Sequence, residues 1–232
     1  SETIKKRIEH NVPNGLLGIN IGPNKDTEDM LNDFLSCAKT FFPIGDYITI
    51  NISSPNTEGL RNFHKEKNLE NLLMKINEIR KNSNFKKSFL LKISPDLDDF
   101  SINNVVDLSL KNNINGIILT NTSDKNRDKL IDSLKSEKGG LSGQPIKELS
   151  TIMIKKFYKK LKGKIPIIGV GGVDSGESAF EKIAAGASAI QLYTGMIYKG
   201  PMIVKEIKKS LILKLNEKGF KNISEAVGSS SN

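Results

Sequence analysis

The chain has 232 residues, of which 37% are hydrophobic and none is Trp, so it can bury one large core of Ile, Leu and Val. Lys and Arg number 35 against 26 Asp and Glu, a formal charge of +9. The lysines are scattered along amphipathic segments with no aromatic platform beside them, so no nucleic-acid partner is predicted. The single cysteine, Cys37, excludes an internal disulfide and a thiolate metal cluster, and no run of 18 apolar residues predicts a membrane span.

Six apolar segments indicate strands, and amphipathic helices alternate with them. The strands are expected within residues 15–22, 47–52, 89–94, 114–122, 165–172 and 188–195. The helices are expected within residues 27–41, 67–82, 100–112, 146–162, 175–185 and 200–217. Strands nearly continuous in Val, Ile and Leu, each followed by a helix, predict an α/β fold with a parallel sheet. Residues 228–232, at the end of the chain, are expected to be disordered.

The glycines decide between an open sheet and a closed barrel. In "IIGVGGVDSG", Asp174 stands where a dinucleotide-binding fingerprint that starts at Gly169 needs its last glycine. In (β/α)8 barrels, the loops after the last two strands commonly bind a phosphate through backbone N–H groups. The last two strands here end in "GVGG" and "LYTG". We therefore expect one α/β domain over residues 1–232, a (β/α)8 TIM barrel that contributes strands three to eight and lacks its first two.

Small polar residues stand where the expected strands end, which is where such barrels place their active sites. The most polar of these stretches is "NISSPNTEGLRN", residues 51–62. The amides of Asn20, Asn51, Asn56 and Asn121 suit a planar ligand with lactam edges, such as a flavin or a pyrimidine, although asparagines also cap helices.

Two further features are open to more than one interpretation. Lys92 lies within the apolar strand "FLLKIS", so we expect it to meet a cofactor that develops negative charge; the alternative is an ion pair with Asp96. The loop "GGLSG", residues 139–143, indicates either close approach to a ligand or a tight turn before a helix. His10 and His64 lie in polar surroundings and are read as ordinary surface residues.

In order and spacing, the segments "INISSPNTEGLR", "LKISPDL", "TNTS", "GGLSG" and "IPIIGVGGV" resemble the dihydroorotate dehydrogenase family. The resemblance runs from Gly15 to Gly228. It implies an FMN-dependent oxidoreductase that converts dihydroorotate to orotate in pyrimidine biosynthesis. Ser54 matches the catalytic base of that family, and a serine there is similar to the membrane-associated class that reduces a quinone.

The resemblance also implies roles for single residues. FMN would be held by Asn20, Asn51, Lys92, Thr120, Gly143, Gly172, Tyr193 and Thr194; Tyr193 would contribute chiefly its backbone N–H. The substrate ring would be bound by Asn51, Asn56, Asn121 and Thr122. No metal is implied. A quinone would be the final electron acceptor.

The family further implies peripheral attachment through an N-terminal segment, on the inner face of a bacterial cytoplasmic membrane or on the mitochondrial inner membrane. The chain is expected to lack that segment together with the first barrel strands. It also carries Glu58 where the family usually has Pro.

Two other functions are compatible with the same pattern. The first is a phosphate-binding barrel isomerase or synthase that uses the glycine loops without a flavin, for which Lys92 supplies only part of the chemistry. The second is a non-catalytic barrel fragment that pairs its open strand edges with another chain.

Overall fold

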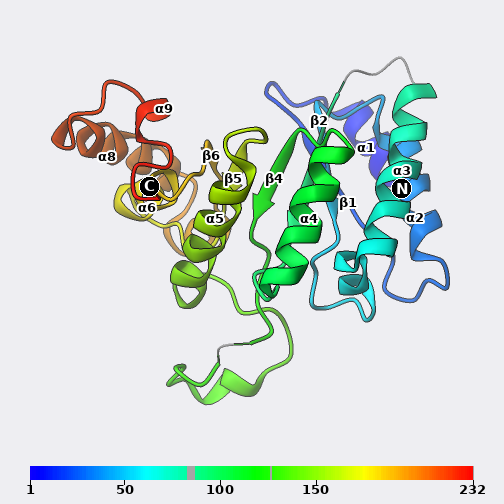
Figure 1. Cartoon of the computed structure of the whole chain (residues 1–232), viewed down its shortest axis with the longest axis horizontal. Coiled ribbons are helices and arrows are strands. Elements are labelled where there is room, and N and C mark those ends of the chain that lie inside the picture. The colour runs from blue at the N-terminus through cyan, green and yellow to red at the C-terminus, as the bar shows by residue number, and fades with distance from the viewer. Residues whose placement is uncertain (83–86, 126, 232) are drawn as a thin grey trace. The chain divides into compact units, whose positions relative to one another are not determined.

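A computed structural model of the chain describes residues 1–82, 87–125 and 127–231. It divides into two compact units, one formed by Ser1–Lys92 and Asp99–Gly116, the other by Ile93–Asp98 and Ile117–Asn232. Strands and helices alternate in each of them (Figure 1). In the described ranges, no helix combines the length and the apolar character needed to cross a bilayer. The expectation of one barrel domain stays a prediction.

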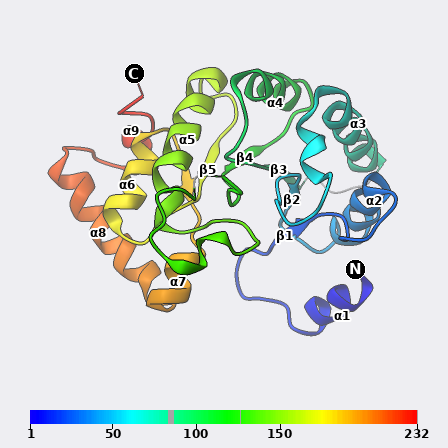
Figure 2. The ribbon, with the colours of Figure 1, turned by 90° about the horizontal axis from the view of Figure 1, so that it is seen from below.

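The first unit is built on the parallel strands β1 (Gly18–Ile21), β2 (Tyr47–Asn51) and β3 (Ser88–Ile93), which pair in chain order. Its helices are α1 (Glu2–His10), α2 (Met30–Phe41), the 3-10 turn η1 (Leu60–His64), α3 (Glu66–Asn82) and α4 (Asp99–Lys111). In Figure 2, α2, α3 and α4 lie along one side of these strands.

The core of this unit follows from the two periodicities of the sequence. The isoleucines Ile19, Ile21, Ile48 and Ile50 alternate along β1 and β2 and are buried. In α3, the buried residues Leu69, Leu72, Leu73 and Ile76 fall at helical spacing. Helix α1 buries no residue, which explains why no apolar stripe predicts it.

The second unit contains the parallel strands β4 (Gly116–Leu119), β5 (Ile167–Gly169) and β6 (Ala189–Ile190). Its helical elements are η2 (Ser133–Ser136), η3 (Gln144–Ile146), α5 (Lys147–Leu161), α6 (Gly176–Ala184), α7 (Thr194–Lys199), α8 (Ile203–Glu217) and α9 (Ile223–Ala226). Helix α6 packs on α8 through Phe180, Ile183, Leu211 and Leu215, and α9 joins this cluster through Ala226.

The six predicted strands and the six predicted helices are confirmed, but two segments differ from expectation. Strand β6 is only two residues long, and residues 194–199 form a helix. Residues 228–231 were expected to be disordered, but they form hydrogen bonds to carbonyls at the C-terminal end of α6 and at Ala185, the residue that follows it. Gly228 N–H donates to Ile183 O at 3.0 Å, and the Ser231 hydroxyl donates to Ala185 O at 3.0 Å. Asn232 lies outside the described residues.

Candidate functional site

In the first unit, the predicted strand-end residues share one face of the sheet. Asn51 is in register with Lys92, and Asn20 is in register with Thr49. Side chains two residues apart on a strand point the same way, so Thr49 and Asn51 lie on the same face. Asn20, Asn51 and Lys92 therefore lie together, opposite the isoleucines that pack on the helices.

The loop after β2 is organised by the side chain of its first residue. Asn51 Oδ1 accepts hydrogen bonds from Ser53 Oγ at 2.8 Å and from Ser53 N–H at 3.3 Å. Ser53 is fully buried, and its carbonyl accepts from Arg61 Nε at 3.4 Å. Ser54 Oγ accepts from Asn56 N–H at 3.2 Å, which leaves the hydroxyl proton of Ser54 for another acceptor. The Ser54 hydroxyl therefore lies on a loop that the contacts of the buried Ser53 hold in place.

Lys92 is half-buried on the same face as Asn51. Burial lowers the pKa of its ammonium, because the charged form loses hydration. Asp96, the alternative ion-pair partner, accepts hydrogen bonds from Ser123 Oγ at 2.6 Å and from Asp124 N–H at 3.4 Å. A partly desolvated cation on this face is suited to a ligand that carries or develops negative charge.

His64 is not a surface residue, as the sequence led us to expect. It is the last residue of η1, and its side chain is only 4% exposed. Its ring Nδ1 lies 3.0 Å from Arg61 O. Burial lowers its pKa to about 4, the hydrogen bond with Arg61 O opposes that change, and the charge of Arg61 adds to it. The polar neighbours in sequence concealed its burial, because packing of η1 against α3 and α4 produces it.

This burial should make stability depend on pH. Unfolded His64 takes up a proton below its ordinary pKa of 6.5, whereas the folded residue does so only near pH 4. The free energy of unfolding should therefore fall by about 3 kcal/mol, on this account, as pH drops from 6.5 to 4. In His64→Gln, urea unfolding followed by circular dichroism should show a decrease smaller by that amount. An equal decrease in both proteins would contradict the buried neutral histidine.

The strand ends of the second unit bring several predicted residues close to the loop after β5, residues 170–173, which is called the glycine loop below. Thr120 N–H donates to Val170 O at 2.9 Å, and the Thr120 hydroxyl is buried with no hydrogen-bond partner in the described part of the chain. Asn121 Oδ1 accepts from Thr122 N–H at 2.8 Å, which orients the amide of Asn121. A buried hydroxyl without a partner is costly and indicates a polar group that a ligand satisfies.

The glycine loop packs so tightly that side chains are excluded. Gly171 and Gly172 have φ values of +123° and +70°. A Cβ at Gly172 would lie 2.8 Å from the Cα of Lys147. Within the described residues, the N–H groups of Gly172 and Val173 donate to no protein acceptor. They are available to an anion, as the prediction of a phosphate-binding loop requires.

The loop at Gly143 and the start of α7 meet beside this glycine loop. A Cβ at Gly143 would lie 3.0 Å from Thr194 Cγ2, and Thr194 Oγ1 donates to Ser142 Oγ at 3.0 Å. A Cβ at Gly195 would lie 2.6 Å from Val173 O. The structure therefore brings Gly143, Gly172 and Thr194 together. The side chain of Tyr193 is 74% exposed, and its role toward FMN stays a prediction.

These features fit FMN in two respects. The amides of the glycine loop and the start of α7 supply neutral donors of the kind that bind a phosphate. In the second unit, the Thr120 hydroxyl has no hydrogen-bond partner among the described residues, as a group that bonds to a flavin ring would. In the first unit, the partly desolvated Lys92 ammonium is a donor that suits the same kind of ligand. Among the described residues, no group of three His, Cys, Asp or Glu side chains is placed to hold a metal ion.

Comparison with known proteins supplies the family. A family model described as dihydroorotate dehydrogenase matches residues 1–215. The chain belongs to the dihydroorotate dehydrogenase family. The quinone-type dihydroorotate dehydrogenase of Bradyrhizobium sp. (strain ORS 278) is 41% identical over 218 residues, 92% of this chain and 60% of that protein. The mitochondrial quinone-type dihydroorotate dehydrogenase of Mus musculus is 42% identical over 214 residues, 91% of this chain and 54% of that protein.

Solved structures of dihydroorotate dehydrogenase agree with this membership. A ligand-free DHODH of Eimeria tenella superposes with a TM-score of 0.90 at 33% identity, covering 100% of this chain and 69% of that chain. This supports the (β/α)8 class predicted for the parallel strands and their helices. The chain spans less than two thirds of the length of the two curated dihydroorotate dehydrogenases named above.

Sequence reasoning missed Lys182 and Ser150 at this site. Both lie on helices, where the sequence pattern gives no reason to expect a buried lysine or a buried serine. The structure instead buries both completely, beneath the glycine loop.

Proposed function

We propose that the chain carries the catalytic site of a quinone-dependent dihydroorotate dehydrogenase, which oxidises (S)-dihydroorotate to orotate in pyrimidine biosynthesis. The observation that supports this most strongly is the loop after β2. The Asn51 side chain holds Ser53, the next residue Ser54 accepts from Asn56 N–H, and Asn51 lies in register with Lys92. Family membership and the names of the relatives support the same reaction.

FMN, held by the residues assigned to it below, would supply the hydride acceptor for C6 of the substrate. The Ser54 hydroxyl takes the proton from C5. A serine alkoxide does not form readily near neutral pH, so the hydroxyl passes the proton on through hydrogen bonds or water. Asn51, Asn56, Asn121 and Thr122 bind the amide and carbonyl groups of the ring, because each of their side chains both donates and accepts hydrogen bonds.

Each residue assigned to FMN has a physical reason for its role. Asn20 and Asn51 present amides on the same strand face as Lys92, whose ammonium would stabilise negative charge on a bound flavin. Thr120 offers its buried hydroxyl. Gly143, Gly172, Tyr193 and Thr194 supply backbone N–H groups and closely packed turns for the phosphate.

Ser54 also supports the choice of electron acceptor. A serine at this position is similar to the class that reduces a quinone, and the relatives named above carry that designation. Quinones reside in membranes, so we propose that the protein works at a membrane surface.

A steady-state assay tests this function. With dihydroorotate as donor, a short-chain quinone should sustain orotate formation, and fumarate or NAD+ should not replace it. Orotate formation with fumarate or NAD+ alone would exclude the quinone class. No orotate with any acceptor from a flavin-loaded protein would exclude the reaction.

A further inference from the structure

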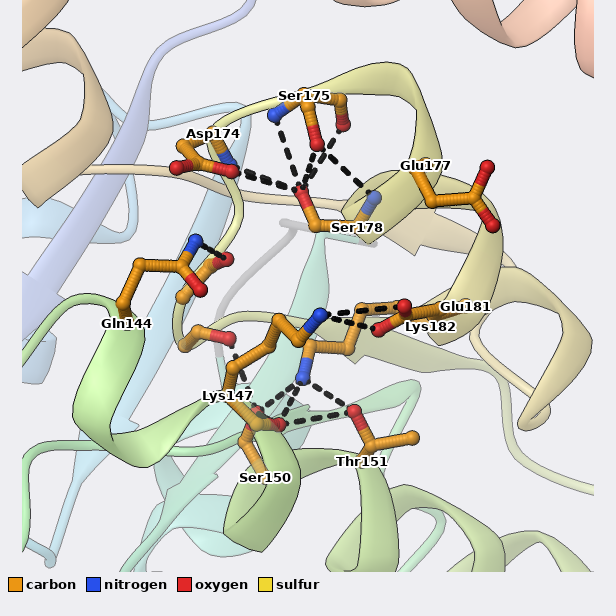
Figure 3. Close-up of polar contacts among 12 residues, drawn as sticks. Gln144, Lys147, Ser150, Thr151, Asp174, Ser175, Glu177, Ser178, Glu181 and Lys182 are labelled. Carbon is orange, nitrogen blue, oxygen red and sulfur yellow. Dashed lines mark hydrogen bonds and ion pairs between the residues drawn. The ribbon is translucent and has the colours of Figure 1, made fainter.

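Lys182 is a fully buried lysine whose surroundings match an ammonium group. It lies on α6 and is 0% exposed. Its Nζ donates to Lys147 O at 2.6 Å, to Thr151 Oγ1 at 2.6 Å and to Ser150 Oγ at 2.5 Å, all near the start of α5 (Figure 3). Three acceptors satisfy the three N–H bonds of an ammonium, whereas a neutral amine would satisfy only two.

A buried positive charge at this position is unfavourable, so we expect Lys182 to have a role other than stabilising the fold. Burial lowers the pKa of Lys182 to about 7, the carboxylate of Glu181 opposes this change, and the like charge of Lys147 adds to it. Glu181 itself forms an ion pair with Lys147 at 3.0 Å. An apolar residue would fill the same space without this cost. The role of Lys182 follows from the groups that accept its hydrogen bonds, above all the Ser150 hydroxyl.

The hydrogen bonds of Ser150 lead from Lys182 to the glycine loop. Ser150 Oγ accepts from Lys182, so its own proton is free to be donated, and both Lys147 O and Gly171 O lie 3.1 Å away. Lys147 O already accepts from Lys182 and, at 2.9 Å, from Thr151 Oγ1. Because a carbonyl has two lone pairs, the Ser150 proton goes to Gly171 O.

Fixing this carbonyl also fixes the direction of an N–H group. Gly171 O and the N–H of Gly172 belong to one planar trans peptide, so they point in opposite directions. With the carbonyl held toward α5, the Gly172 N–H points away from α5. Gln144 Nε2 donates to Gly172 O at 3.1 Å and orients the N–H of Val173 in the same manner.

We propose that Lys182 is a positioning residue that, through the Ser150 hydroxyl, orients the Gly171–Gly172 peptide to bind the phosphate of FMN. This inference rests on the proposed function, because it takes FMN as the ligand of the glycine loop. Lys182 does not touch the cofactor. Its effect is that the chain binds FMN, which carries a phosphate, more tightly than riboflavin, which does not.

Riboflavin provides the matching test, since it has the ring of FMN without the phosphate. The dissociation constants of FMN and riboflavin are measured by quenching of flavin fluorescence for the wild-type chain, Lys182→Met, Ser150→Ala and the double variant. Lys159→Met, which removes an exposed lysine of α5, is the control. Circular dichroism checks that each protein is folded.

We expect wild type and Lys159→Met to prefer FMN over riboflavin. Lys182→Met and Ser150→Ala should each reduce this preference about tenfold or more, the effect of misplacing a hydrogen bond to a charged group. Riboflavin affinity should change little. Because the two residues act through one chain of bonds, the double variant should lose no more than the larger single effect.

Other outcomes separate the inference from the function beneath it. An unchanged preference in Ser150→Ala, or equal losses for both flavins, would overturn the positioning role and leave FMN binding intact. A wild-type chain that binds FMN no better than riboflavin would overturn the phosphate site itself, and the inference with it. If Lys182→Met does not fold, Ser150→Ala decides alone, since it keeps the ammonium.

Discussion

Ser54→Ala should slow the reduction of bound FMN by dihydroorotate about a hundredfold or more, the usual contribution of a positioned proton acceptor. FMN should remain bound, because Ser54 is not among the residues assigned to the cofactor. The hydrogen bond that Ser54 accepts from Asn56 N–H, at 3.2 Å, is local to the loop. Rapid mixing under anaerobic conditions measures the reduction rate, and the flavin absorbance of the same sample measures occupancy.

Ser54→Cys is the matched control for the chemistry of the proton. A thiol has an ordinary pKa of about 8.5, so its thiolate becomes abundant at a pH where a serine hydroxyl stays protonated. The variant should recover part of the lost rate, and this rate should rise with pH toward the pKa of the thiol. Loss of flavin from Ser54→Ala in proportion to the loss of rate would sink the assignment of Ser54 as the base.

Lys92→Met should weaken the binding of reduced flavin more than the binding of oxidised flavin. The Lys92 ammonium lies on the strand face that carries Asn51, and its lowered pKa reflects lost hydration that an anionic ligand would replace. We expect the midpoint potential of bound FMN to become more negative by about 30 mV or more, which is about 1.4 kcal/mol for a two-electron couple. A redox titration against reference dyes measures it.

Lys67→Met, which removes an exposed lysine of α3, controls for the change in net charge. Lys92→Arg keeps the positive charge and should restore part of the potential. If Lys92→Met lowered only the thermal stability and left the potential of the flavin unchanged, Lys92 would be a structural residue.

The regular elements could be predicted because each carries a clear period. The buried stripe of α3 and the alternating isoleucines of β1 and β2 are visible in the sequence. Helix α7 was missed because "LYTGMIYK" continues a short apolar run, which does not distinguish a strand from a helix. Helix α1 has no buried face to reveal it.

The site was predictable only where polar residues follow a strand. Asn51, Ser54 and Thr120 stand at such positions, and for Asn51 the parallel register then gives Lys92 as its neighbour. Lys182 and His64 could not be found in this way. Their burial depends on elements distant in sequence, α5 above Lys182 and α3 and α4 around His64, and a single residue pattern does not contain that information.

The most direct test of the proposed function is the visible absorption spectrum of the FMN-loaded protein, recorded before and after anaerobic addition of dihydroorotate. The account predicts a flavin spectrum that bleaches on addition and returns when a quinone is supplied. A flavin spectrum that dihydroorotate leaves unchanged, or a colourless protein that cannot be loaded with FMN, would contradict it.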